Sequence, residues 1–274
     1  MLHKKTNLHT NTASHKKTAL ITGASSGIGK EFAKIHAAQG GDLIIVARRD
    51  EALNALKAEL EDKYGVMVTC ISCDLSQYNA AQMLFDKVQQ TGIQVDYLIN
   101  NAGFGLVGKF YELPLARQQQ MIHLNMTTLT ELMYLFLPKM VERNFGKILN
   151  TSSTASLVAG PNQAVYFATK AYVSSLSNAV ASELHDTNVT VTALLPGATE
   201  TEFGATSGMD KTALFAKTAS ARSVAEDGYN GMMKGALDVI SGLPLSTKLT
   251  LKFAPLVPKK MILERVRKAQ EIKV

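Results

Sequence analysis

A tyrosine and a lysine four residues apart form the most chemically suggestive pair in the sequence. Tyr166 and Lys170 lie in the stretch AVYFATKAYVSSL, whose pattern predicts a helix. Residues at i and i+4 share one face of a helix, so we expect the phenol and the ammonium to be neighbours. A nearby ammonium favours the phenolate and lowers the pKa of the phenol. Such a tyrosine can give and take a proton near neutral pH, which is general acid–base chemistry.

A glycine-rich turn upstream adds a second kind of chemistry. Gly23, Gly27 and Gly29 follow the apolar run TALIT and precede a predicted helix. Glycines at such a junction permit a tight turn and let backbone N–H groups approach a pyrophosphate at the helix N-terminus. The pattern G-x-x-x-G-x-G differs from the dinucleotide fingerprint G-x-G-x-x-G. Taken alone, it leaves open a glycine turn that binds no ligand.

The end of the second predicted strand indicates which dinucleotide would bind. NAD-preferring enzymes usually place an acid there, where it bonds the ribose 2′-hydroxyl. This sequence has Ala47 at that position, followed by Arg48 and Arg49. A guanidinium can bind a phosphate bidentately, so Arg48 favours the 2′-phosphate of NADP(H). Arg49 either assists or is a solvated residue at the start of a helix.

The elements that must position these residues alternate along the chain. Apolar β-branched runs predict strands at 18–22, 42–47, 66–72, 95–100, 146–152, 189–195 and, shorter, near 238–240. Helices are predicted between them at 27–39, 50–64, 76–91, 115–142, 163–185 and 223–236. Apolar strands alternating with helices indicate a mainly parallel sheet covered on both faces. We therefore predict one doubly wound α/β domain of the Rossmann type with about seven strands, which binds ligands beyond the carboxyl ends of its strands.

The two ends of the chain differ in charge from the middle. Residues 1–17 carry four lysines and no acid, and residues 248–274 carry eight basic residues and two acids. The ends thus hold +4 and +6, so a total of +6 leaves −4 for the remainder. An acidic middle argues against nucleic-acid binding. We predict a flexible basic N-terminal tail (1–17), an NADP-binding Rossmann-type catalytic domain (18–247) and a basic amphipathic C-terminal segment (248–274).

Composition also favours a cytoplasmic protein without a metal. The sequence has no run of 18 apolar residues, and its start lacks the apolar core of a secretory signal. Cys70 and Cys73 fall in or near a predicted buried strand, which suits a reducing compartment. A C-x-x-C metal site would need a second pair of ligands, which the sequence does not supply.

Six motifs, in the correct order between about residues 18 and 201, resemble the classical short-chain dehydrogenase/reductase family. The glycine turn, Thr22–Gly29, matches the family pattern T-G-x-x-x-G-I-G. The other five are Asp74-Leu75, the N-N-A-G run Asn100–Gly103, Ser153, the pair Tyr166 and Lys170, and the P-G-x-x-x-T segment Pro196–Thr201. The family includes NAD(P)-dependent oxidoreductases with a doubly wound fold. The first asparagine of N-N-A-G is implied to hold the sheet together.

The resemblance implies a set of cofactor contacts, and Arg48 makes the expected cofactor NADP(H). The contacts are expected at Gly23, Ser25, Ser26, Gly27, Ile28, Gly29, Arg48, Asp74, Leu75, Asn101, Ala102, Gly103, Tyr166, Lys170, Pro196, Gly197, Thr199 and Thr201.

The resemblance also implies a catalytic group of four residues, Asn125, Ser153, Tyr166 and Lys170. Ser153 lies thirteen residues before Tyr166, which is the family distance, whereas Ser152 misses it by one. Tyr166 would exchange a proton with the substrate oxygen, to which Ser153 would donate a hydrogen bond. Lys170 would lower the pKa of the phenol and hold the ribose hydroxyls. Asn125 would kink its helix and link Lys170 to solvent through water.

The expected substrate pocket is mostly apolar. The family builds it from residues after 103, from 154–163 and from the loop 198–220. These segments contribute Phe104, Leu106, Val107, Leu157, Val158, Pro161, Phe203, Met209, Leu214 and Phe215, without a cluster of cationic residues. A hydrophobic ketone, an aldehyde or their alcohols is favoured over a strongly anionic substrate. The same apolar residues could instead close a lid over the cofactor.

The C-terminal segment and the longest helices suggest partners. Pro258 can start a helix in which Ile262, Val266 and Ala269 share a face and basic residues occupy the others. Such a helix can lie on an anionic membrane surface, or it can cover a groove of its own domain or of a neighbouring subunit. The family resemblance implies a homodimer or homotetramer that assembles through 115–142 and 163–185.

Together these features predict an NADP(H)-dependent oxidoreductase that interconverts a carbonyl and an alcohol on a small apolar substrate, with Tyr166 as acid and base. Two alternatives remain open. The first is a non-catalytic NADP(H)-binding regulatory protein, against which the presence of Ser153, Tyr166 and Lys170 argues. The second is a reductase of lipid or steroid ketones associated with a membrane surface.

Overall fold

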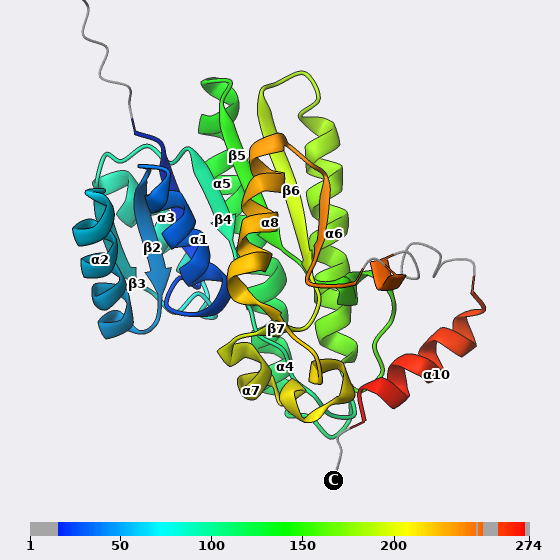
Figure 1. The fold of residues 1–274 in the computed structure, drawn as a ribbon. Coiled ribbons are helices and arrows are strands. Elements are labelled where there is room, and N and C mark those ends of the chain that lie inside the picture. Colours follow the sequence, from blue (N-terminus) through cyan, green and yellow to red (C-terminus); the bar gives the residue numbers. More distant parts are fainter. Residues whose placement is uncertain (1–15, 245, 249–256, 272–274) are drawn as a thin grey trace, which may run out of the picture.

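Parallel strands run through the middle of the molecule and form one seven-stranded sheet (Figure 1). The computed structural model describes residues 16–244, 246–248 and 257–271. Within them the sheet has the order β3-β2-β1-β4-β5-β6-β9 and only parallel pairings. Its strands are β1 (Thr18–Thr22), β2 (Asp42–Ala47), β3 (Val68–Ser72), β4 (Tyr97–Asn100), β5 (Gly146–Thr151), β6 (Val189–Pro196) and β9 (Asp238–Ser241). The order reverses between β1 and β4, which is where sheets of this kind bind ligands.

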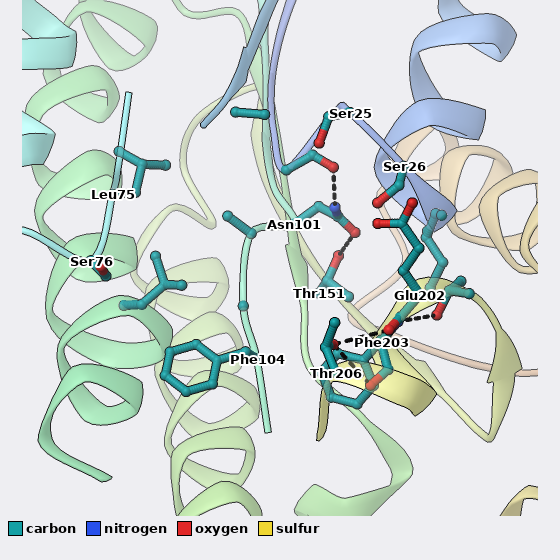
Figure 2. Close-up of a pocket in the computed structure, with 18 of the residues that line it drawn as sticks. Ser25, Ser26, Leu75, Ser76, Asn101, Phe104, Thr151, Glu202, Phe203 and Thr206 are labelled. Atoms are coloured by element: carbon teal, nitrogen blue, oxygen red, sulfur yellow. Dashed lines mark hydrogen bonds between the residues drawn. The ribbon is translucent and has the colours of Figure 1, made fainter. Parts of the chain in front are cut away.

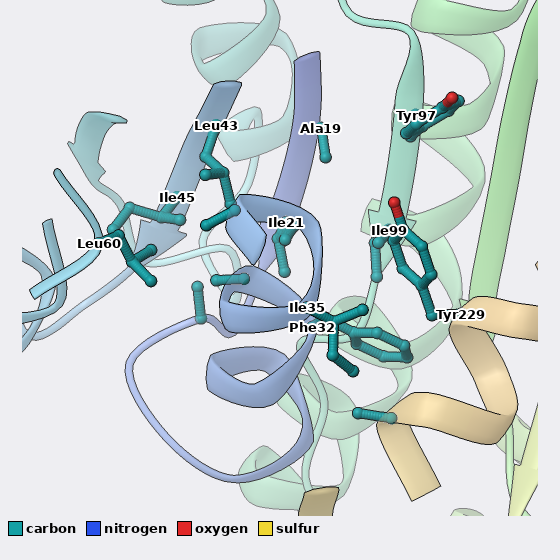
Figure 3. Close-up of a cluster of buried hydrophobic side chains, with 14 of the residues drawn as sticks. Ala19, Ile21, Phe32, Ile35, Leu43, Ile45, Leu60, Tyr97, Ile99 and Tyr229 are labelled. Atoms are coloured by element: carbon teal, nitrogen blue, oxygen red, sulfur yellow. The ribbon is translucent and has the colours of Figure 1, made fainter. Parts of the chain in front are cut away.

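Helices cover both faces of the sheet, as the sequence predicts. One face carries α1 (Gly27–Ala38), α2 (Asp50–Tyr64) and α8 (Ala221–Lys234). The other carries α3 (Ala80–Gln90), α5 (Leu129–Glu142) and α6 (Ala164–Glu183). Because successive side chains of a strand point to opposite faces, Ala19 and Ile21 of β1 enter the first core, shown in Figure 3, while Leu20 enters the second. The predicted α/β, doubly wound Rossmann-type fold is confirmed.

The helix predicted over 115–142 is divided into three parts. It begins as α4 (Leu115–Ile122), passes through a π-helical segment (His123–Thr128) and continues as α5. Asn125 lies in the π-helical turn, and its side chain hydrogen-bonds the backbone of Phe104 instead of facing solvent. Single π-helical turns are frequent at functional sites, and this one brings an amide side chain to the loop that follows β4.

The stretch predicted as a polar loop over 198–220 contains several short elements. These are β7 (Thr199–Glu200), α7 (Glu202–Ser207), two 3₁₀ turns (Met209–Lys211 and Ala213–Phe215) and β8 (Ala219–Ser220). Elsewhere in the chain, another 3₁₀ turn (Thr154–Leu157) lies between β5 and α6. Thr201 caps α7, because its hydroxyl oxygen accepts a hydrogen bond from the Phe203 amide. Strands β7 and β8 pair with each other and lie outside the main sheet. The segment is therefore structured by its own caps and pairings.

The C-terminal helix α10 (Lys259–Ala269) packs on the domain. Ile262, Val266 and Ala269 are half-buried, so the face that the sequence marks as apolar is turned inward. The next residue, Gln270, is fully buried and hydrogen-bonds Gln163 at the start of α6. Residues 1–15 of the predicted N-terminal tail, like 249–256 and 272–274, lie outside the described residues. No helix in the described part of the chain is long and apolar enough to cross a membrane.

Candidate active site

A cavity of about 650 Å³ opens at the carboxyl ends of the strands. Its walls come from the turn between β1 and α1, the ends of β2, β3 and β4, the segment after β5, helix α6, and the chain that leads from β6 into α7. Figure 2 looks into the cavity, with Ser25 and Ser26 on one side and Leu75 and Phe104 on the other. The cavity therefore lies where the topology predicts a ligand.

All residues that the sequence predicts as cofactor contacts line this cavity, with the exception of Gly29. Gly29 sits inside α1, and a Cβ atom there would lie 2.3 Å from the carbonyl oxygen of Gly23. Its role is to let the helix approach the preceding turn closely, which is the packing role of a glycine in such loops. Gly29 is thus part of the support for the cavity and does not line it.

The glycine turn is held to the loop after β4 by hydrogen bonds. The Thr22 hydroxyl accepts from the backbone amides of Asn101 and Ala102, at 2.9 and 3.0 Å. The Asn101 side-chain amide donates to the Thr22 carbonyl at 3.1 Å. Gly23 adopts a φ of +67°, a conformation that L-residues rarely take. A side-chain hydrogen bond also joins strands β4 and β5, because the side-chain amide of Asn100 donates to the side-chain oxygen of Asn150 at 2.9 Å.

Tyr166 and Lys170 line the inner end of the cavity, and both side chains are buried. The Lys170 ammonium lies 5.9 Å from the centre of the Tyr166 ring and donates to the Thr151 carbonyl at 2.7 Å. Burial raises the pKa of Tyr166, and a hydrogen bond between Ser153 and the phenol offsets part of that rise. The neighbouring Ser152 hydroxyl instead donates to the Lys170 carbonyl at 2.8 Å. Ser153 is therefore the serine that meets the tyrosine.

The expected lowering of the tyrosine pKa by the lysine is not found. Burial raises the pKa of Tyr166 to about 12, against the smaller effect of Ser153. Burial also lowers the pKa of Lys170 to about 8. Desolvation, which disfavours the charged form, is the largest cause of the shift in both groups. Near neutral pH the phenol is protonated, and so is most of the lysine.

Asn125 does not line the cavity but braces it. Its side-chain amide donates to the Phe104 carbonyl at 3.0 Å and to the Thr169 hydroxyl at 3.1 Å, while its oxygen accepts from the Phe104 amide at 3.2 Å. A Cβ atom at Gly103 would lie 3.0 Å from the oxygen of Asn125 and 3.5 Å from the nitrogen of Lys170. Asn125 thus joins the loop after β4 to the helix that carries Tyr166.

The opposite end of the cavity carries positive charge. Arg48 lines it and is exposed, and among the described residues its guanidinium has no ion pair. Burial alone would raise the pKa of Asp74, but hydrogen bonds from Ser76 and Gln77 and the charge of Arg48 together lower it. Ala47 ends β2 without an acidic side chain. A phosphate group at this end would meet a guanidinium and no facing carboxylate from β2.

Several residues that line the cavity were not among the predicted cofactor contacts, and two of them, Arg49 and Arg117, are cationic. Arg49 also borders the cavity, where its guanidinium forms an ion pair with Glu202 of α7, with the closest nitrogen and oxygen 2.9 Å apart. The pair joins residues 153 positions apart, so no local pattern could have shown it. Arg117 of α4 lines the cavity as well and stacks 4.8 Å from the centre of the Phe104 ring.

An apolar cluster includes Tyr166 and packs around its ring. It contains most of the residues predicted for the substrate pocket, namely Phe104, Leu106, Val107, Val158, Phe203, Met209 and Phe215. The Phe203 ring lies 5.7 Å from that of Tyr166. The sequence did not place Val266 of α10 there, although this residue packs against the same cluster. Leu157 is instead 37% exposed.

Comparison with known proteins agrees with this arrangement. The short chain dehydrogenase family matches residues 17–212. An uncharacterized oxidoreductase of Bacillus subtilis, YvrD, is 37% identical over 187 residues, which cover 68% of this chain and 70% of that protein. The 7beta-hydroxysteroid dehydrogenase of Collinsella aerofaciens is 31% identical over 66% of this chain and 68% of its own.

A solved structure extends the likeness over nearly the whole chain. The short-chain dehydrogenase of Sphingobium yanoikuyae in complex with NADPH superposes with a TM-score of 0.79 at 30% identity, covering 94% of this chain and 99% of that one. The family match, the strand order and the cavity at the strand ends point the same way. The chain belongs to the short-chain dehydrogenase/reductase family and is an NAD(P)-dependent oxidoreductase of alcohols and ketones.

Proposed function

We propose that this protein is an NADP(H)-dependent reductase of apolar ketones or aldehydes that uses Tyr166 as the proton donor. The observation that carries the proposal is the layout of one cavity. A buried phenol, hydrogen-bonded by Ser153, lies at its inner end, and Arg48 and Arg49 lie at its outer end. A dinucleotide that spans the cavity would bring its reactive ring to the phenol and its ribose phosphate to the arginines.

The residues present fit a phosphorylated dinucleotide. The glycine turn packs against the loop after β4 more closely than a side chain would permit, since a Cβ atom at Gly23 would lie 3.0 Å from Ala102. Ala47 occupies the position where an acidic residue would repel a 2′-phosphate, and Arg48 next to it provides a positive charge. The related Sphingobium yanoikuyae enzyme was solved with NADPH. The cofactor would supply the hydride, and Lys170 would hold its ribose hydroxyls.

The chain itself supplies the proton. Because the pKa of Tyr166 is raised to about 12, the phenol stays protonated near neutral pH and can donate to a carbonyl oxygen. Ser153 would donate a second hydrogen bond to that oxygen, where negative charge develops during reduction. Lys170, whose pKa is about 8, would remain an ammonium and favour the phenolate that is left behind. A protonated phenol is the form that carbonyl reduction requires.

The substrate end favours a bulky apolar ketone. A Cβ atom at Gly105 would lie 3.0 to 3.2 Å from Met209, Phe203 and Tyr166, so the missing side chain lets this loop pack closely beside the phenol. The surrounding cluster is aliphatic and aromatic. The relative from Collinsella aerofaciens is a hydroxysteroid dehydrogenase, which is consistent with a large rigid substrate. Assembly into a homodimer or homotetramer through residues 115–142 and 163–185 stays a prediction.

The test is a panel of carbonyl compounds assayed by loss of NADPH absorbance. The panel should run from small aldehydes to cyclic and steroid ketones, with NADH as the parallel cofactor. We expect turnover with NADPH, with kcat/KM rising toward the larger apolar ketones. A protein that binds NADPH tightly but reduces no member of the panel would instead support the non-catalytic regulatory function.

One observation favours a second version of the function, in which the enzyme works at a membrane surface. The outward face of α10 carries exposed Lys259, Lys260 and Arg265 together with Met261, which is 54% exposed. Basic residues beside an exposed apolar side chain suit an anionic bilayer. Flotation with vesicles of anionic and of neutral lipid tests this, with a Lys259→Glu, Lys260→Glu variant as the comparison. Equal recovery with both vesicle types would exclude the membrane version.

A further inference from the structure

An ion pair crosses the mouth of the cavity between the end of β2 and the start of α7. The guanidinium of Arg49 lies 2.9 Å from one carboxylate oxygen of Glu202 and donates to the other at 3.2 Å. The same guanidinium donates to the Ser25 hydroxyl at 3.2 Å. The Glu202 side chain extends from α7 toward Ser26 of the glycine turn, as Figure 2 shows, and both residues line the cavity.

The carboxylate of Glu202 has anion-binding groups as its partners. The hydrogen bond from Arg49 is the main cause of its lowered pKa, and the Ser26 hydroxyl contributes as well, so the group is fully charged near neutral pH. An arginine together with hydroxyls of a glycine-rich turn is a set of donors that suits a phosphate. In the structure these donors surround a carboxylate that belongs to the chain itself.

Arg48 and Arg49 differ in whether their guanidinium groups are paired with a carboxylate. Arg48 has no ion pair within the described part of the chain, whereas Arg49 is paired with Glu202. Both partners of that pair are about half exposed, at 51% and 57% of their side-chain surface. Exposed ion pairs contribute little to stability, so a dianionic phosphate can displace the carboxylate at small cost. NAD(H), which lacks the 2′-phosphate, has no group to offer Arg49 in exchange.

From these contacts we infer that Glu202 is a cofactor-specificity residue that competes with the 2′-phosphate of NADP(H) for Arg49. The inference rests on the proposed function and deepens it. Arg48 forms the constant part of the phosphate site, and Arg49 joins it only when the Glu202 carboxylate leaves. Glu202 thus weakens NADP(H) binding, and it begins α7, next to Phe203 of the substrate cluster.

The test measures the affinity of the purified full chain for NADPH and for NADH by titrating dihydronicotinamide fluorescence. Glu202→Gln keeps the size of the side chain and removes its charge. We expect it to lower the Kd for NADPH about three- to fivefold, the range of one exposed ion pair, with less than a twofold change for NADH. Adenosine 2′,5′-bisphosphate should show the same gain and adenosine 5′-monophosphate should not, which isolates the 2′-phosphate.

Two further variants separate competition from a general charge effect. Glu200→Gln removes an exposed acid two residues away, on β7 and outside the cavity lining, and should leave the ratio of the two Kd values unchanged. Arg49→Gln should weaken NADPH binding, and adding Glu202→Gln to it should bring no selective gain. If Glu202→Gln leaves the NADPH to NADH ratio as in the wild type, the competition is refuted while the proposed function stands. If the wild type binds neither cofactor, both fail.

Discussion

The two halves of the cavity are built on different supports. The cofactor half consists of strand ends and the turns that follow them, held by backbone hydrogen bonds such as those from the Ala24 amide to the Val46 carbonyl and from the Cys73 amide to the Ala47 carbonyl. The substrate half is held by side-chain packing among elements from distant parts of the chain, including α7, the Met209–Lys211 turn and α10. Tyr166 stands where the halves meet.

This contrast explains why the two halves tolerate different changes. Backbone hydrogen bonds at the ends of parallel strands fix the positions of N–H groups whatever the neighbouring side chains are. Apolar packing depends on the volume and shape of each partner. The first support suits a cofactor whose phosphates do not vary, and the second can be remodelled for a new substrate without disturbing the sheet.

The largest effect is expected at the junction, from Tyr166→Phe. Removing the hydroxyl deletes the proton donor, so kcat/KM should fall by about 10²- to 10⁴-fold, the range of general acid catalysis. The Kd for NADPH should stay within twofold, because the cofactor half keeps its backbone contacts. Stopped-flow turnover and fluorescence titration measure the two quantities. Tyr172→Phe is the matched control, since its hydroxyl hydrogen-bonds Thr130 of α5 and the residue does not line the cavity. Near-normal turnover of the Tyr166 variant would remove the tyrosine from the mechanism.

The depressed pKa of Lys170 gives the next effect, on the pH dependence of stability. The lysine pKa is about 8 in the folded protein and near 10.5 when unfolded, so between these values the unfolded chain binds more protons. The wild type should therefore gain stability as pH rises from 8 to 10.5, by at most about 3 kcal/mol. Lys170→Met lacks this gain.

Urea unfolding of both proteins at pH 7 and pH 10 provides the comparison. The difference between the two free energies of unfolding, wild type minus Lys170→Met, should grow at the higher pH, because the raised pKa of Tyr166 is common to both. A constant difference would mean that the lysine is not desolvated at the junction.

Much of the cofactor half could be predicted from the sequence. The strand over 18–22 was placed correctly, and every predicted lining residue except Gly29 faces the cavity. Glycines, asparagines and strand ends can be recognised from the local sequence. Because the strands are parallel, the residues that follow them meet at one edge of the sheet. The apolar face of α10 was also predicted, because it depends on the helical period alone.

The features that could not be predicted from the sequence depend on contacts between residues far apart in the chain. The ion pair of Arg49 with Glu202 joins two segments whose proximity follows only from the fold. The pKa of Tyr166 was predicted in the wrong direction, because the spacing to Lys170 shows that two groups are close but not how completely they are desolvated. For the same reason, the sequence did not determine which surface α10 packs against.

A substitution in the glycine turn tests the cofactor half directly. Gly27 has a φ of +54°, and a Cβ atom there would lie 2.9 Å from the side chain of Thr201. Gly27→Ala should cost about 1–2 kcal/mol of stability from backbone strain and weaken NADPH binding about tenfold. Gly40→Ala is the matched control, since it has a φ of +78° but nothing within 4 Å of the new Cβ. It should lose similar stability and no affinity, and an equal loss of affinity in both variants would show that strain alone, not the loop, is responsible.

The substrate half should respond to the smallest of these changes, Val266→Ala in α10. Removing two methyl groups from a half-buried contact costs about 1 kcal/mol of packing beside the apolar cluster, so KM for a bulky ketone should rise about threefold. The Kd for NADPH should not change, because α10 does not line the cofactor half. Met261→Ala, on the exposed side of the same helix, should change neither quantity. If Val266→Ala weakened NADPH binding as much as it raised KM, the two halves would be one cooperative unit, and the separation drawn between backbone and side-chain supports would not hold.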